Sequence, residues 1–150
     1  MKKNPIIREV PRRQLAVLRI RGRATASGAE CRFYRSHKTA RKGFKVYLSL
    51  PEARSAFTRQ KRAYKRGLGP KPGRLFVSVM NKNRRELWYG YETQIAKPVT
   101  ETFFDRHCDE LERKLRKLGI KPCDLYRWNC GQIGNRLVLV DFGNVSCCWG

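Results

Sequence analysis

The clearest periodic pattern of apolar residues runs from Glu101 to Leu118. Its apolar positions recur at intervals of four and three residues, which places them along one side of an α-helix. Gly119 follows directly and is typical of a helix end. The sequence therefore predicts a helix over 101–118 whose buried seam consists of Phe104, Cys108, Leu111, Leu115 and Leu118.

A second helix is predicted from Pro51 to Arg66. Proline is favoured in a first helical turn, Glu52 suits the positive end of the helix dipole, and Gly67 marks the end. Gln60 shares the apolar stripe, and a polar side chain on an inward face needs a hydrogen-bond partner. The remaining residues of the stripe are Ala53, Ala56, Phe57, Ala63 and Tyr64.

Shorter apolar runs with period-two alternation predict strands. In the run 43–48, alternation places Phe44, Val46 and Leu48 on one face, with Lys45 and Tyr47 on the other. A lysine in the middle of a strand ordinarily faces solvent. The predicted strands cover residues 14–21, 31–35, 43–48, 75–80 and 86–91, with a hairpin turn at 81–83.

The charge of the chain is far from balanced. In 150 residues, 34 Lys and Arg stand against 12 Asp and Glu, which gives a net charge of +22 and an isoelectric point near 10.5. Such an excess favours an anionic partner and says nothing about the fold. A basic surface that is merely solvated is the alternative.

Length and cysteine pattern narrow the class of protein further. A chain of this length predicts one domain with a modest core. The six cysteines include no C-x-x-C pair, so a structural zinc site is not expected. The cysteines are expected to be reduced thiols in a cytoplasmic protein. No apolar run approaches the length of a membrane span or follows Met1 as a signal segment would, so no membrane association is expected.

Candidate chemistry is concentrated between Ile120 and Gly143. Asp124 stands five residues before Asn129, and Asp141 directly follows the strand-like run 137–140. Mg²⁺ prefers oxygen ligands and is usually held by one or two carboxylates together with substrate phosphates. Two carboxylates and one amide oxygen therefore suit a site that holds Mg²⁺ against a nucleotide.

This stretch resembles the catalytic and metal-binding loops of the protein kinases, Asp-Leu-x-x-x-Asn followed by Asp-Phe-Gly. The likeness spans about residues 15–143 and is closest to compact bacterial or phage-type kinase-like proteins. It implies ATP and Mg²⁺ as cofactors, with Lys45 on the nucleotide phosphates and Asn129 and Asp141 on the metal. Asp124 is implied to orient or deprotonate the acceptor hydroxyl.

The resemblance also assigns the small-residue turn 22–28 to the glycine-rich loop. Ala26, Gly28 and Cys31 then occupy the three glycine positions, and Phe33 the valine. Small residues let backbone N–H groups approach phosphates closely. An ordinary hairpin turn is the alternative reading of the same residues.

Two further cofactor contacts are implied. The family pairs its strand lysine with a helix glutamate, and Gln60 occupies that place, where it could hydrogen-bond Lys45 without the strength of an ion pair. The nucleotide-binding hinge is implied at 91–95, including Tyr91 and Thr93.

The fold expected is α+β and protein-kinase-like: a five-stranded antiparallel sheet with one helix, then a reduced, mainly helical second lobe. Residues 1–13 are expected to form a basic arm, 14–95 the first lobe and 96–150 the second. Only seven residues follow Gly143, so the helices that normally support the second lobe are not expected; a dimer that restores them is an open alternative. Pro122 and Cys123 replace the usual His-Arg before the aspartate.

Two functions remain open. One is an ATP- and Mg²⁺-binding kinase that transfers a phosphoryl group to a protein Ser or Thr or to a small-molecule hydroxyl. The other is an inactive kinase-like module whose basic clusters bind nucleic acid or an acidic partner protein, for example as a phage-type inhibitor of host machinery. Those clusters lie in the two predicted helices, as Arg54, Arg59, Lys61, Arg62, Lys65 and Arg66, and as Arg113, Lys114, Arg116 and Lys117.

Overall fold

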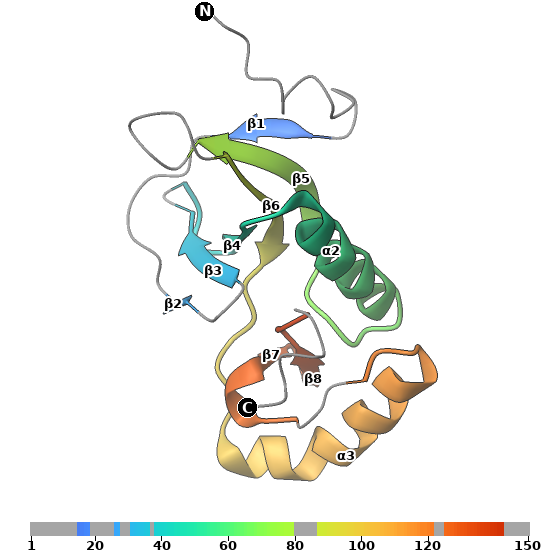
Figure 1. Ribbon diagram of the computed structural model, residues 1–150. Coiled ribbons are helices and arrows are strands. Elements are labelled where there is room, and N and C mark those ends of the chain that lie inside the picture. Colours follow the sequence, from blue (N-terminus) through green and yellow to red (C-terminus); the bar gives the residue numbers. More distant parts are fainter. Residues whose placement is uncertain are drawn as a thin grey trace, which may run out of the picture.

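A computed structural model describes residues 15–18, 26–27, 31–36, 38–79, 87–121 and 125–142. These segments form an α+β fold with a six-stranded sheet, a separate two-stranded sheet and two α-helices. Figure 1 shows the larger sheet and the first helix at one end of the molecule, and the second helix with the small sheet at the other. The α+β class is as predicted.

The larger sheet has the strand order β1-β5-β6-β4-β3-β2. All neighbours are antiparallel except β1 and β5, which are parallel. The prediction of a five-stranded antiparallel sheet was therefore wrong in two respects. First, a sixth strand, β2, lies where a turn was expected, and it pairs with β3. Second, β1 pairs in parallel with β5 at the edge of the sheet, and this long-range pairing has no local sequence signal. The strands are β1 (Ala16–Leu18), β2 (Ala26–Ser27), β3 (Cys31–Arg35), β4 (Lys42–Tyr47), β5 (Pro72–Val79) and β6 (Leu87–Gln94).

Helix α2 (Leu50–Lys65) lies against one face of this sheet, as Figure 1 shows. The Ser49 hydroxyl caps it by accepting a hydrogen bond from the Glu52 N–H at 3.3 Å. Gly67, with φ of 74°, ends it. The buried stripe is confirmed for Ala53, Ala56, Gln60 and Ala63, but Tyr64 is 41% exposed and was wrongly predicted to be part of it.

Strand β4 is covered on both faces, so Lys45 does not face solvent as a lysine in the middle of a strand ordinarily does. Lys45 and Tyr47 are buried on the side of α2, and Val46 is buried on the other side with Tyr34 and Phe76. Leu48 was predicted to share the Val46 face, but it is 65% exposed because β4 ends one residue earlier.

The second part of the fold begins with helix α3 (Glu101–Lys117), which Thr100 caps by accepting from the Phe103 N–H at 3.2 Å. Leu111 and Leu115 are buried in its predicted seam. The helix packs against β8 of the small sheet, and a hydrogen bond from Leu139 N–H to the Leu68 carbonyl (2.9 Å) joins that sheet to the turn after α2. The remaining elements are the 3₁₀ helix η1 (Arg127–Asn129), β7 (Cys130–Ile133) and β8 (Arg136–Leu139).

No helix in the described part of the chain is both long enough and apolar enough to cross a membrane.

Candidate functional site

Lys45 is the centre of a buried polar cluster between the large sheet and α2. It lies on the inward face of β4 and is 8% exposed. Its ammonium donates a hydrogen bond to Gln60 Oε1 at 3.0 Å and another to the backbone carbonyl of Val140. The lysine therefore joins a strand, a helix and the segment after β8.

Gln60 is fully buried, and both ends of its amide are used. Oε1 accepts from Lys45 and also from the Tyr91 hydroxyl at 2.8 Å. Nε2 donates to Thr93 Oγ1 at 2.7 Å and to the Pro70 carbonyl at 3.1 Å. Because a carboxylate has no donor, only an amide satisfies the acceptors on this second side.

The environment of Lys45 disfavours its charge. Burial lowers the pKa of Lys45 from 10.5 to about 8, while Cys31 and Asp141 act in the opposite direction. The rings of Tyr91 and Phe142 lie near the ammonium, with their centroids 5.7 Å and 5.3 Å from Nζ. These rings offset part of the lost hydration by cation–π attraction.

The segment after β8 is fixed by α2. Phe142 is 2% exposed, and its carbonyl accepts two hydrogen bonds from Arg59, from Nε at 3.1 Å and from Nη2 at 2.8 Å. Arg59 Nη1 donates to the Ser55 hydroxyl at 2.8 Å, which orients the guanidinium. Asp141, between the carbonyls of Val140 and Phe142, is exposed, so its carboxylate side chain remains in contact with solvent.

Asn129 lies next to the same segment. Its backbone carbonyl accepts from the Val140 N–H at 2.9 Å, and its side-chain Oδ1 accepts from the Tyr126 N–H at 3.0 Å. The backbone of Asn129 is thereby bonded to Val140, the residue that directly precedes Asp141. The predicted catalytic residue, Asp124, lies outside the described residues, as does Gly143 of the Asp-Phe-Gly motif.

The two predicted hinge residues lie inside β6. Tyr91 pairs with Lys45 and Leu75 across the sheet, and Thr93 pairs with Gly43 and Pro72. Their side chains both contact Gln60. The strand continues to Gln94, so the connection toward α3 begins after it.

The predicted phosphate loop is described only in part. Ala26 lies in β2 and pairs with Phe33 of β3, whereas Gly28 lies outside the described residues. Cys31 is close enough to Lys45 for the two to influence each other's pKa: burial raises the pKa of Cys31, and Lys45 lowers it.

Two participants were missed by the sequence reasoning. The Val140 carbonyl is a backbone group and has no side-chain signature. Arg59 was counted as one of several surface cations of the helix, although it directly precedes Gln60 and binds the Phe142 carbonyl. Its position beside an inward-facing residue is the only signal that the sequence carried.

The described residues fit Mg²⁺ only in combination with a phosphate ligand. Among them, no group of three or more His, Cys, Asp or Glu side chains is placed to hold a metal ion. Asp141 and Asn129 offer a carboxylate and an amide oxygen, however, and protein-bound Mg²⁺ usually keeps waters and takes its other ligands from substrate phosphates. The donor set matches that mode of binding.

Comparison of the chain with protein-family models and with curated protein sequences finds no match.

Proposed function

We propose that this protein binds ATP with Mg²⁺ in a kinase-like site and transfers a phosphoryl group to the hydroxyl of a protein Ser or Thr or of a small molecule. The observation that supports this most is the convergence on Lys45 of two segments far apart in the chain. Gln60 follows it by 15 residues and Val140 by 95, and both accept hydrogen bonds from its ammonium.

In this proposal Lys45 neutralises the nucleotide phosphates. A phosphate oxygen is a stronger acceptor than a backbone carbonyl because it is charged, so it competes with Val140 for the ammonium. Gln60 holds the lysine in place in either case. Asn129 and Asp141 would hold the Mg²⁺, which would supply positive charge to offset the charge that develops on the transferred group. Asp124 orients the acceptor hydroxyl.

The arrangement of the sheet also supports a kinase-like fold. The strand that carries Lys45 lies between β3 and β6, and the helix that follows it presents Gln60 to the lysine. The Asp-Phe-Gly motif follows the last strand of the small sheet, as the resemblance implies. Arg59 joins the helix to this motif.

The experiment is a thermal melt of the purified protein with and without ATP and Mg²⁺. A ligand that binds only the folded state stabilises it by about 2.7 kcal/mol at a hundredfold excess over Kd. For a chain of this size that corresponds to a rise in Tm of about 5–10 °C. Asp141→Asn is expected to abolish the rise.

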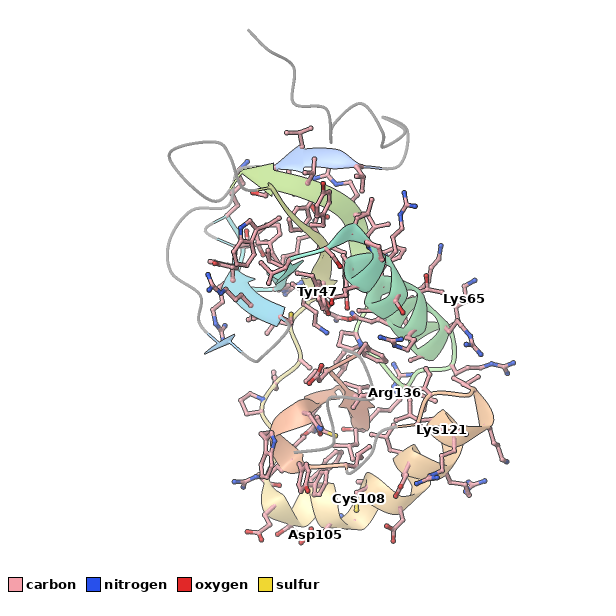
Figure 2. All side chains as sticks on the ribbon, viewed as in Figure 1. Tyr47, Lys65, Asp105, Cys108, Lys121 and Arg136 are labelled. Atoms are coloured by element: carbon pink, nitrogen blue, oxygen red, sulfur yellow. The ribbon has the colours of Figure 1, made fainter. Side chains whose placement is uncertain are left out.

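Asp105→Asn is the matched control, because Asp105 is an exposed aspartate of α3 that lies far from Tyr47 of β4, the strand that carries Lys45 (Figure 2). It removes the same charge and is expected to leave the rise intact. No rise in the parent protein, or an equal rise in Asp141→Asn, would contradict the nucleotide site. A rise in Tm without phosphoryl transfer by the parent protein would contradict the catalytic part alone, and so would transfer that Asp124→Ala leaves unchanged.

A further inference from the structure

Cations gather where the two long helices end. Arg62 of α2 donates a hydrogen bond from its guanidinium to the carbonyl of Leu118, the C-cap of α3, so the two helix ends are adjacent. Arg136 of β8 lies against Gly67. Figure 2 shows Lys65, Lys121 and Arg136 on this side of the molecule. We define the helix-end corner as the exposed residues Arg62, Lys65, Arg66, Lys117, Lys121 and Arg136.

No acidic side chain comes from the segments that build this corner. The sequence has no Asp or Glu between residues 53 and 85, between 113 and 123, or between 125 and 140. The ion pairs found among the described residues are Lys42–Glu92, Arg74–Glu92, Lys114–Glu110 and Arg116–Glu112, and none includes a residue of the corner. Its positive charges are therefore not neutralised by the described part of the chain.

Stabilisation of helix ends accounts for only part of this charge. Cations favour the C-terminus of a helix, where the dipole corresponds to about half a negative charge. Two helix ends therefore offset about one of the six positive charges. The surplus leaves a field that attracts anions from solution.

The composition of the corner distinguishes between two kinds of anionic partner. Protein interfaces have cores that are enriched in aromatic residues and depleted of charge. The described residues include five large apolar side chains that are exposed, and only one of them, Tyr64, belongs to the end of α2; the others are Val17, Leu48, Tyr126 and Trp128. A surface of cations with a single aromatic ring is a poor protein interface.

We propose that the helix-end corner binds the phosphate backbone of a single-stranded nucleic acid. Backbone contacts by Lys and Arg need no groove or fixed shape, since each neutralises one phosphate and releases counterions. Tyr64 precedes Lys65 in α2 and is 41% exposed, so it offers the corner an aromatic ring on which an unpaired base stacks. The inference is independent of the nucleotide site at Lys45.

The test is fluorescence anisotropy with a labelled single strand of about 20 nucleotides, a length that exceeds typical single-strand site sizes, over a series of KCl concentrations. The variant is Lys65→Ala, Lys117→Ala and Lys121→Ala combined, because none of these side chains has a hydrogen bond or ion pair among the described contacts. We expect binding at least about tenfold weaker, and a slope of log Kd against log salt reduced by about two, since each phosphate contact to a single strand contributes about 0.7.

The matched control removes three exposed cations from the end of β3 and the connection to β4: Arg35→Ala, Lys38→Ala and Arg41→Ala. It changes the net charge equally and is expected to weaken binding much less. Equal weakening in both triple variants would overturn the proposal, because the binding would then reflect net charge alone. Both variants are melted first, and a cooperative transition at or above the Tm of the parent shows that each is folded.

Two further measurements address the chemistry of the partner. Tyr64→Ala is expected to weaken single-strand binding several-fold and leave duplex binding unchanged; equal effects on both would contradict base stacking. A polyglutamate peptide of matched charge is expected to compete poorly, and competition equal to that of the oligonucleotide would identify an acidic protein instead. Asp141→Asn is expected to bind the oligonucleotide like the parent, which separates this proposal from the nucleotide site.

Discussion

Lys45 has a buried positive charge whose direct hydrogen-bond partners are both neutral, an amide and a backbone carbonyl. The lowered pKa, about 8, follows from that combination. In the unfolded chain the lysine has its ordinary pKa of 10.5. Between these two values the unfolded state binds more protons than the folded state, so this group makes folding more favourable as pH rises from about 8 to 10.5.

Gln60→Glu is therefore expected to raise the pKa of Lys45, because it places a carboxylate within about 3 Å of the ammonium. An opposite charge at that distance favours the charged form, so we expect a titration midpoint above the value of about 8 in the parent. Lysine Cε chemical shifts followed by NMR against pH measure it directly. Gln60→Met removes the acceptor without adding charge and is the control; it should leave the midpoint at or below that of the parent. A midpoint unchanged by Gln60→Glu would contradict the direct contact.

The same substitution tests why an amide stands here. Glu at position 60 leaves the Pro70 carbonyl and Thr93 without the donor that Nε2 supplies, and an unsatisfied buried acceptor costs about 1–3 kcal/mol. The variant is thus expected to be less stable than the parent near pH 7 in urea unfolding, despite its new ion pair. Equal or greater stability would show that the ion pair outweighs these bonds.

The contact between Lys45 and Gln60 could be predicted from the sequence. The helical period placed Gln60 inward, and the resemblance indicated which strand lysine it would meet. The exposure of Tyr64 could not be predicted by the same means, because a neighbouring residue on a helix lies only about 100° away and the edge of the buried stripe depends on what packs against it. The hydrogen bond from Lys45 to the Val140 carbonyl joins residues that are 95 positions apart, so it has no local signal in the sequence.

At the scale of elements, the close packing of β4 and β6 depends on Gly90. It lies opposite Val46 in β4 and Phe76 in β5, and a Cβ atom added there would collide with the backbone carbonyl of Lys45 and come within 2.8 Å of the Phe76 ring. A backbone atom cannot move aside as a side chain can. The strand that positions Lys45 would have to shift.

Gly90→Ala is accordingly expected to reduce the free energy of unfolding by about 3 kcal/mol, at the upper end of the cost of overpacking. Gly119→Ala is the control: its φ of 75° disfavours alanine, but nothing lies within 4 Å of the added Cβ, so a loss of about 1 kcal/mol is expected. Urea unfolding measures both. Equal losses would mean that strand packing at Gly90 is looser than the contacts indicate.

The helices were predictable as elements to within about one residue because their caps, glycine stops and apolar periods are local. Both end in the same way, with glycines at positive φ and buried Leu68 and Ile120 next in sequence. The parallel pairing of β1 with β5 was not predictable, since the register of an edge strand depends on residues about 60 positions away. Sequence patterns therefore predicted which segments are helices or strands better than they predicted which strands pair with each other.

For the molecule as a whole, the net charge of +22 opposes folding through repulsion among its own cations. The four ion pairs of the described residues each involve a partner on the surface, where such pairs contribute little. Long-range repulsion should thus outweigh local attraction. Raising KCl from about 0.01 M to about 0.1 M shortens the Debye length from about 30 Å to about 10 Å and screens charges on opposite sides of the molecule.

Added KCl is therefore expected to raise the melting temperature in this range, by about 2–4 °C for each 1 kcal/mol of repulsion removed. Differential scanning fluorimetry without ligand measures the change, and sucrose at equal osmolality controls for effects unrelated to charge. The triple variant Lys65→Ala, Lys117→Ala and Lys121→Ala has three positive charges fewer, so it should melt higher than the parent at low salt and respond less to KCl. A melting temperature that falls with KCl would show that short-range ion pairs contribute more to stability than the repulsion among surplus cations takes away. The same surplus is what attracts an anionic partner, so this outcome would also weaken the argument for one.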